Sequence, residues 1–330
     1  MRSSAASDVY KRQLYLCVII ILVSLDEFVN NFYKLFYRNG KRRNKMKIRD
    51  TKRYIYALTG YPLGHSMSPF IHKALFEISK IDASYGLVET PPEDLGDSFK
   101  NTLSALRGFN VTIPHKTAVI KYLDELSPRA ELFGAVNTVD VREDKIVGHN
   151  TDCAGFLSAL QSADIELGGD ILLLGSGGVA RMIAFESVLA DANLTIAVRE
   201  SGVPKAEKIK KEIKQKLSKD CKIILLDEAE GSYDLIINGT PVGMFPNVDA
   251  CPVKKEVIQS SKAAFDVIYN PYETVFIKYA KQAGIKYSGG LSMLVWQAAV
   301  AQEIWNGVKF SNEDIDKVID LTQKELEKNE

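Results

Sequence analysis

From residue 54 to the C-terminal end of the chain, short apolar runs alternate with longer stretches of helix-compatible periodicity. Apolar runs of four to eight residues that are bounded by turn-forming residues are typical of buried strands. We therefore predict strands at 54–61, 84–89, 108–113, 171–174, 194–198, 222–226, 235–238, 264–269 and 285–288. Most of them are separated by roughly 10 to 16 residues of helical pattern, as expected of βαβ units and mainly parallel sheets. The pattern thus predicts an α/β fold.

One stretch departs from this alternation. The sequence VNTVDVREDKIVGHN, beginning at Val136, predicts two short strands around a polar turn at Glu143 and Asp144. The turn-rich residues 166–170 then lead into a new strand. These features predict that a first domain ends between about residue 150 and residue 170.

The first 45 residues do not share the pattern. An unbroken apolar run of ten residues, 14–23, follows Lys11 and Arg12. It falls short of the ~20 residues that span a bilayer, and no small-x-small cleavage site follows it as a signal peptide would require. Because the opening MRSSAASDVYKRQ resembles translated linker sequence, we interpret residues 1–45 as a non-native or disordered extension. Met46 is a natural start before the first predicted strand.

The composition narrows the class of function. The 330 residues are 46% apolar and 25% charged, as in ordinary globular proteins, and Lys plus Arg equals Asp plus Glu at 42 each. A balanced charge creates no field that would attract nucleic acid or a membrane surface, so a small-molecule substrate is expected. The four cysteines lack CxxC spacing and the four histidines lack metal-ligand spacing. We therefore expect no disulfide framework, no metal site and a reducing, cytoplasmic compartment.

The stretch ILLLGSGGVAR, residues 171–181, has the form of a buried strand that turns sharply into a helix. Gly175, Gly177 and Ala180 occupy the three small positions of the GxGxx(G/A) dinucleotide fingerprint. The free amides at the start of the following helix would bind the pyrophosphate. The residues predicted to contact the dinucleotide here are Gly175, Ser176, Gly177, Gly178, Val179 and Ala180.

The end of the next strand indicates which dinucleotide binds. An acidic residue at this position accepts from a free ribose 2′-hydroxyl, whereas an arginine accommodates a 2′-phosphate. Arg199 stands at this point and predicts NADP. Glu200 beside it places a negative charge near the expected phosphate and favours NAD instead.

Seven ordered motifs resemble the shikimate dehydrogenase family, within the shikimate/quinate dehydrogenase group. Besides the glycine-rich turn, they are GYPLGHSMSP at 60–69, FNVTIPHK at 109–116, GAVNTV at 134–139, GHNTD at 148–152, NGTPVGM at 238–244 and GGLSMLVWQAA at 289–299. The resemblance implies an α/β substrate-binding catalytic domain at 46–152, a Rossmann domain at 153–288, and C-terminal helices at 289–330 that pack back on the substrate domain. It also implies a monomer or homodimer.

The activity implied by this resemblance is the reversible NADPH-dependent reduction of 3-dehydroshikimate to shikimate. The nearest alternative is a quinate/shikimate dehydrogenase that uses NAD, and a remote one is a non-catalytic ligand sensor on the same fold. A different two-domain NADP enzyme, such as a folate dehydrogenase, would not explain the SMSP, NTD and MLVWQAA stretches together.

Lys116 and Asp152 are the candidate catalytic residues. Reducing a ring ketone requires a proton donor near the developing alkoxide, and a lysine paired with a carboxylate can supply one. Lys116 follows Pro114 in what should be the first turn of a helix, where the macrodipole disfavours a cation, so a position selected for stability would rather be acidic. Asp152 precedes an apolar helix, so its structural alternative is a first-turn aspartate.

The resemblance also implies which residues surround the ligands. Ser66 and Ser68 would hydrogen-bond the substrate carboxylate, and Tyr269 would help to close the site. The ring hydroxyls would be surrounded, next to Lys116, by Asn110, Thr112, Asn137, Asp152 and Gln297. On the cofactor side, the further residues expected are Arg199, Thr240, Gly243, Met244 and Gly290.

Several of these residues have structural alternatives. Ser68 precedes Pro69 and is a strong helix N-cap signal, whereas Ser66 has no such alternative. Thr112 could be an ordinary strand residue, and an asparagine such as Asn110 or Asn137 could satisfy turn backbone. Gln297 lies just off the apolar stripe of its predicted helix, where a side chain could meet a cleft.

Overall fold

The computed structural model describes residues 54–64 and 66–328. The chain divides into two compact units, Met1–Met46 and Lys47–Glu330, and all described residues belong to the second. The predicted extension at residues 1–45 lies outside the described residues. Among the residues described, no helix is long and apolar enough to cross a bilayer.

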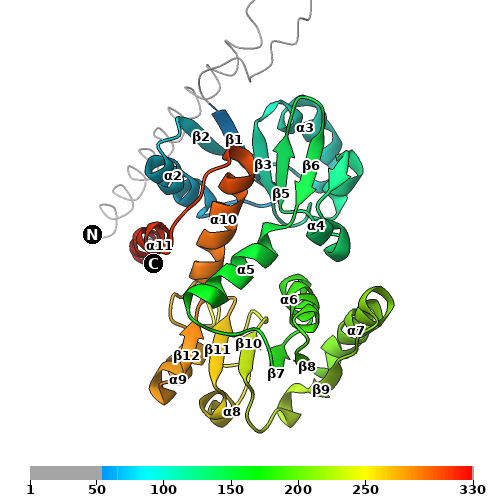
Figure 1. Cartoon of the computed structure of the whole chain (residues 1–330), viewed down its shortest axis with the longest axis vertical. Coiled ribbons are helices and arrows are strands. Elements are labelled where there is room, and N and C mark those ends of the chain that lie inside the picture. Colours follow the sequence, from blue (N-terminus) through cyan, green and yellow to red (C-terminus); the bar gives the residue numbers. More distant parts are fainter. Residues whose placement is uncertain (1–53, 65, 329–330) are drawn as a thin grey trace, which may run out of the picture. The chain divides into compact units, whose positions relative to one another are not determined.

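The first sheet contains the order β2-β1-β3-β5-β6-β4 (Figure 1). Its strands are β1 (Tyr54–Gly60), β2 (Ala83–Glu89), β3 (Gly108–Val111), β4 (Glu125–Leu126), β5 (Thr138–Val141) and β6 (Ile146–His149). β2, β1 and β3 are parallel, while β5 pairs antiparallel with both β3 and β6. The β5–β6 hairpin around Glu143 and Asp144 confirms the prediction from sequence. β4 was not predicted, because two residues are too few to show a period.

The second sheet is parallel throughout, in the order β12-β11-β10-β7-β8-β9. Its strands are β7 (Asp170–Leu174), β8 (Asn193–Val198), β9 (Lys222–Leu225), β10 (Leu235–Asn238), β11 (Ala263–Asp266) and β12 (Lys286–Ser288). In sequence order this arrangement is the doubly wound 3-2-1-4-5-6 Rossmann topology read from its other edge. The predicted α/β fold with a Rossmann-type dinucleotide-binding part is therefore confirmed.

Helices connect and cover these strands. Those next to the first sheet are α2 (Ser68–Ser79), α3 (Leu95–Asn101) and α4 (Pro128–Phe133), and α5 (Thr151–Ser162) leads to the second sheet. The later ones are α6 (Gly178–Leu189), α7 (Val203–Leu217), α8 (Lys255–Ser260), α9 (Val275–Ala283), α10 (Gly290–Asn306) and α11 (Asn312–Glu327). The domain boundaries at 152 and 288 stay predictions, because Lys47–Glu330 packs as one compact unit.

Helix α10, the next-to-last helix of the described residues, returns to the first sheet. The indole ring of Trp305 stacks on Tyr56 of β1 with ring centroids 4.7 Å apart. Its Nε1 donates to the Val139 carbonyl on β5 at 2.9 Å, and Arg107 donates to the Trp305 carbonyl at 2.6 Å. Because the Trp305 ring is buried, it anchors α10 to the first sheet by both packing and hydrogen bonding.

Candidate active site

Lys116 and Asp152 form an ion pair. The Lys116 Nζ lies 2.5 Å from Asp152 Oδ2, and the two side chains are 30% and 19% exposed. Asp152 stands in the first turn of α5, where Asn150 caps the helix by accepting from the Cys153 amide. A carboxylate is stabilised at this end of a helix by the free amides and the macrodipole. Asp152 can therefore stabilise α5 as a first-turn aspartate and also pair with Lys116.

The local structure expected at Lys116 was wrong. Residues 113–117 form a turn, followed by a short 3-10 helix at Ala118–Tyr122 rather than by an α-helix. The Lys116 carbonyl accepts from the Val136 amide at 2.8 Å, so it is not offered to an amide four residues ahead. Lys116 therefore precedes a helix instead of standing in its first turn, and its ammonium group pairs with Asp152.

Asn137 holds this pair in place. Its Nδ2 donates to Asp152 Oδ1 at 2.8 Å, and its Oδ1 accepts from the Thr151 amide at 2.7 Å. The side chain is 3% exposed. Asn137 therefore both satisfies backbone at the start of α5, as its structural alternative proposed, and fixes the Asp152 oxygen that does not face Lys116.

Gln297 of α10 joins the same cluster. Its Oε1 lies 3.4 Å from Asn137 Nδ2, and its Nε2 donates to the Leu294 carbonyl at 3.0 Å. Four predicted site residues are thus brought together from the turn after β3, the residue before β5, α5 and α10, namely Lys116, Asn137, Asp152 and Gln297.

Asn110 lies one layer deeper. Its Oδ1 accepts from the Tyr85 hydroxyl at 2.7 Å, and its Nδ2 donates to Thr138 Oγ1 at 2.9 Å. The ring of Tyr85 stacks on His72 with centroids 4.0 Å apart, and burial lowers the pKa of His72 to about 3. The Asn110 carboxamide is therefore engaged with protein groups on both sides, and its contact with a substrate stays a prediction.

The two serines differ from expectation. Helix α2 begins at Ser68, its N-cap is Met67, and no side chain caps it, so the N-cap alternative for Ser68 is wrong. The Met67 carbonyl accepts from the Ile71 amide, so the first helical hydrogen bond begins at Met67. The helix therefore starts one residue earlier than expected from a Ser68 N-cap followed by Pro69. Ser66, by contrast, has a structural role, because its Oγ accepts from the Ser68 amide at 3.3 Å.

Thr112 and Tyr269 both lie just beyond strands. The Thr112 amide donates to the Thr59 carbonyl at 2.9 Å, which extends the ladder past β3 as the strand-former alternative predicts. β11 ends at Asp266 and not at Tyr269, because the Ile268 amide turns back to the Asp266 carboxylate at 3.0 Å. Burial raises the pKa of the Tyr269 phenol.

The turn between β7 and α6 has the geometry of the dinucleotide fingerprint. Gly175 adopts φ +102°, and a Cβ there would lie 2.8 Å from Thr240 Cγ2. The space beside Gly177 and Gly178 is open, so a ligand can approach the backbone, and Gly177 is the N-cap of α6. A Cβ on Gly239 would stand 3.0 Å from the Cβ of Ala180, which shows why the third position is small.

Arg199 follows β8, and Glu200 begins the short 3-10 turn Glu200–Gly202. Both side chains are exposed, and Arg199 forms no ion pair with another described residue. The guanidinium is therefore available to a ligand at the end of the strand where a 2′-phosphate is expected.

The loop after β10 contains three of the predicted cofactor residues. Thr240 donates through its amide and its hydroxyl to Asn238 Oδ1, at 3.0 and 2.7 Å. Gly243 adopts φ +97°, and the Met244 side chain is exposed. The side chain of Asn238 therefore holds the start of this loop through hydrogen bonds. Asn238 was not among the site residues predicted from the sequence.

Asp266 was also missed. Its carboxylate is fully buried and accepts from Asn238 Nδ2 at 3.0 Å and from Thr274 Oγ1 at 2.6 Å, besides the Ile268 amide. Burial raises the pKa of Asp266 to about 7. An aspartate that ends the apolar run AAFD, at the carboxyl edge of a parallel sheet, was the available signal.

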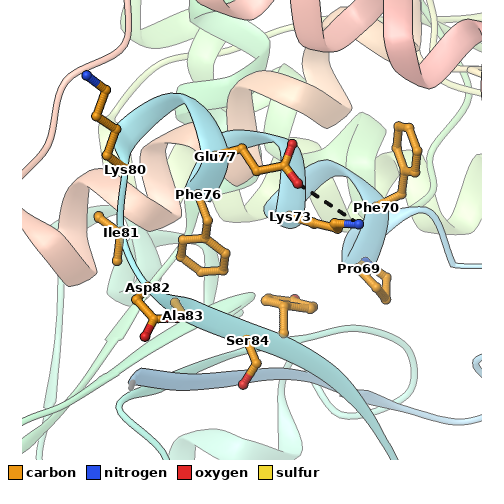
Figure 2. A pocket seen from close by; sticks show the side chains of 11 residues that line it. Pro69, Phe70, Lys73, Phe76, Glu77, Lys80, Ile81, Asp82, Ala83 and Ser84 are labelled. Carbon is orange, nitrogen blue, oxygen red and sulfur yellow. Dashed lines mark ion pairs between the residues drawn. The ribbon is translucent and has the colours of Figure 1, made fainter. Parts of the chain in front are cut away.

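The candidate residues do not line the groove between α2 and β2 shown in Figure 2. Phe76 and Ile81 point into this groove, while Lys73 and Glu77 pair across one turn of α2 at 4.0 Å. Within residues 54–64 and 66–328, no three His, Cys, Asp or Glu side chains gather as metal ligands would.

Comparisons with known proteins point to one family. The substrate binding domain of shikimate dehydrogenase matches residues 58–139. A shikimate dehydrogenase (NADP(+)) from Methanococcus maripaludis is 42% identical over 79% of this chain and 94% of its own. A shikimate dehydrogenase crystallised with NADP+ has a TM-score of 0.74 at 39% identity, covering 81% of this chain and 95% of that one. The Thermus thermophilus enzyme in complex with NADP(H) and shikimate has a TM-score of 0.73 at 34% identity, over 82% and 99%.

Proposed function

Because this chain belongs to the shikimate dehydrogenase family, we propose that it catalyses the reversible NADPH-dependent reduction of 3-dehydroshikimate to shikimate. It is thus an NADP-dependent oxidoreductase of the shikimate pathway, which leads to chorismate and the aromatic amino acids. The observation that supports this most directly is the Lys116–Asp152 ion pair, whose carboxylate accepts from Asn137, which in turn contacts Gln297.

The chemistry divides between cofactor and protein. When bound, NADPH supplies the hydride. Lys116 Nζ donates a proton to the oxygen at the 3-position, where negative charge develops, and recovers it when shikimate is oxidised. Asp152 Oδ2 aims the ammonium group, while Asn137 prevents the carboxylate from rotating away. A fixed dyad of this kind is pre-organised before substrate arrives.

The substrate is recognised by polar groups around the dyad. Ser66 and Ser68 hydrogen-bond the ring carboxylate, and Tyr269 closes the site. The ring hydroxyls meet Asn110, Thr112, Asn137, Asp152 and Gln297. Asn137 supports this proposal most strongly, because its side chain already contacts both Asp152 and Gln297.

The residues of the second sheet fit NADP. The open space beside Gly177 and Gly178 and the free amides of α6 suit a pyrophosphate, and exposed Arg199 suits a 2′-phosphate. The further contacts we propose are Gly175, Ser176, Val179, Ala180, Thr240, Gly243, Met244 and Gly290.

The cell compartment and assembly that we propose are a cytoplasmic enzyme and a monomer or homodimer. Cys153 and Cys221 support a reducing compartment, because both thiols are free and buried. Light scattering on the purified chain would decide between monomer and dimer.

The alternative that an observation favours is a quinate/shikimate dehydrogenase that uses NAD, because the exposed Glu200 carboxylate stands beside Arg199. One assay separates the two proposals: oxidation of NADPH and of NADH, each with 3-dehydroshikimate and with 3-dehydroquinate. We expect the highest kcat/KM with NADPH and 3-dehydroshikimate. A higher kcat/KM with NADH, or comparable turnover of 3-dehydroquinate, would establish the alternative, and no turnover with any pair would refute both.

A further inference from the structure

Asp266 connects three elements around the proposed cofactor site, although it lies beneath that site. The carboxylate ends β11, is fully buried and accepts three hydrogen bonds, from Asn238, Ile268 and Thr274. All three partners are donors, so the pocket is complementary to a group that only accepts, which is the ionised form of a carboxyl group.

The first connection leads to the loop at residues 239–244. Asn238 Nδ2 donates both to Asp266 Oδ1 and to the Val242 carbonyl, at 3.0 and 3.3 Å. The Asn238 Oδ1 then receives the amide and the hydroxyl of Thr240. Asp266 thereby fixes which way the Asn238 carboxamide faces, and this orientation determines the shape of the loop.

The second connection leads to the turn that precedes Tyr269. Asp266 accepts from the Ile268 amide, and the Ile268 carbonyl accepts from the Gly290 amide at 3.1 Å. A Cβ on Gly290 would collide with the Val267 carbonyl oxygen, so the start of α10 is seated directly on this turn. The helix that begins there also provides Gln297.

The third connection leads to α9. The Thr274 hydroxyl donates to Asp266 Oδ2 and accepts from the Ile277 amide at 3.3 Å, so the same hydroxyl caps the helix. Asp266 therefore receives hydrogen bonds from β10, from the turn after its own strand and from the start of α9.

From this geometry we propose that Asp266, as a carboxylate, is a positioning residue that holds the cofactor loop at 239–244 and the turn at 267–269 in the arrangement that binds NADPH. The inference rests on the proposed function, which makes this loop a cofactor contact. Protonation would convert one accepting oxygen into a donor, so one of the three hydrogen bonds would be lost or reversed.

The surroundings place this change near neutral pH. Burial raises the pKa of Asp266 to about 7, and the three donors oppose the rise only in part. No Lys, Arg or His among the described residues pairs with the carboxylate, whose partners are Asn238, Ile268 and Thr274. The Cys251 thiol is a titratable group that feels its charge, and burial raises the pKa of that thiol as well. Above about pH 7 Asp266 is therefore ionised, and as the pH falls through that value the KM for NADPH should rise.

The test compares the wild-type enzyme with Asp266→Asn, measuring KM for NADPH and kcat with saturating 3-dehydroshikimate. Loss of a hydrogen bond to a charged group corresponds to roughly a tenfold rise in KM at alkaline pH. The ratio of variant KM to wild-type KM should then fall towards about one as the pH drops through about 7, because the wild type loses its carboxylate as well. Titration of the NADPH 2′-phosphate affects both proteins equally and cancels in this ratio.

Two matched sets of variants exclude a merely structural effect. Glu186 is also a buried carboxyl group with a raised pKa, paired with Arg129 at 3.1 Å, so Glu186→Gln should leave the KM for NADPH unchanged at every pH. Thr274→Val removes a donor to Asp266 and should move the midpoint of the KM profile to higher pH, whereas Thr274→Ser retains the donor and should preserve it.

A ratio that does not vary with pH, or an equal effect of Glu186→Gln, would overturn the proposal. If Asp266→Asn fails to fold, the comparison of Thr274→Val with Thr274→Ser tests the proposal instead. Identical dependence of the KM for NADPH on pH in these two variants would overturn the proposal. If the wild type shows no turnover, the proposed function fails, and the dissociation constant of NADPH measured by nucleotide fluorescence over the same pH range tests Asp266 separately.

Discussion

The two halves of the proposed site are built in opposite ways. Around Lys116 and Asp152, side chains interlock: Asn137 contacts the carboxylate, the backbone of α5 and Gln297 at once. At the β7–α6 turn, the site is formed by backbone atoms, and the glycines leave open space beside Gly177 and Gly178 where other residues would place a side chain. The first region therefore depends on chemical identity and the second on shape.

This difference separates the expected kinetic effects. A change of charge or hydrogen bonding near Lys116 removes an interaction made in the transition state and should reduce kcat. Added bulk at the glycine turn prevents the nucleotide from approaching and should raise its KM. The comparison would therefore fail if substitutions near Lys116 mainly raised the KM for the nucleotide, or if substitutions at the glycine turn mainly lowered kcat.

The largest effect is expected at the dyad. Lys116→Ala or Asp152→Asn should lower kcat by ~10² to 10⁴, the usual contribution of a positioned proton-transfer group, with NADPH binding nearly unchanged. Because the two side chains contact each other, the double variant should lose little more than the worse single one. Steady-state kinetics of the three variants provide the check, and fully additive losses would show that the residues act independently.

A smaller effect, on KM rather than kcat, is expected for Gly175→Ala. The residue has φ +102°, and the new Cβ would stand 2.8 Å from Thr240 Cγ2. Strain of about 2 to 3 kcal/mol corresponds to roughly a 30- to 150-fold rise in KM for NADPH. Gly231→Ala is the matched control, since Gly231 has φ +86° with nothing near its Cβ. It should lower the melting temperature without changing KM.

Arg199 and Glu200 sharpen the comparison, because these are the two positions where we propose that charge acts on the nucleotide. Charge-assisted hydrogen bonds of ~1.5 to 3 kcal/mol each predict at least a tenfold rise in KM for NADPH in Arg199→Ala, with little change for NADH. An exposed carboxylate is well screened, so Glu200→Thr should strengthen the NADPH preference by only ~0.5 to 1 kcal/mol. An equal rise in KM for NADPH and for NADH would show that Arg199 does not contact the 2′-phosphate.

The smallest effect concerns neither region. A chain that begins at Met46 should be soluble and as active as the full chain, because the predicted strands and motifs all follow that residue. Specific activity and the yield of soluble protein measure this. An insoluble or inactive product would show that residues 1–45 contribute to folding or function.

Much of the fold could be predicted because its signals are local. Several strands of the parallel sheet contain short apolar runs, such as ILLL at 171–174 and LII at 235–237, and the glycine turn shows its spacing directly, so both were found to within a few residues. The seven motifs also identified the family correctly.

The errors arose where a distant partner decides the local structure. The turn at Lys116 forms because its carbonyl bonds Val136, and nothing in the residues next to Lys116 reveals this. Asp266 and Asn238 are 28 positions apart, and the sequence does not show that their side chains bond until β10 and β11 pair. Buried hydrogen-bond partners of this kind follow from tertiary packing and not from periodicity.

The return of α10 has a consequence for synthesis of the chain. Trp305 covers Tyr56 and bonds the Val139 carbonyl, which precedes it by 166 positions. At ~5 to 20 residues per second, a ribosome takes roughly 8 to 33 s to cover that distance. During this interval the nascent first sheet exposes an apolar face that a chaperone would recognise. A nonsense mutation after β12 would leave the same face permanently open and remove Gln297, so its product would be prone to aggregation rather than merely inactive.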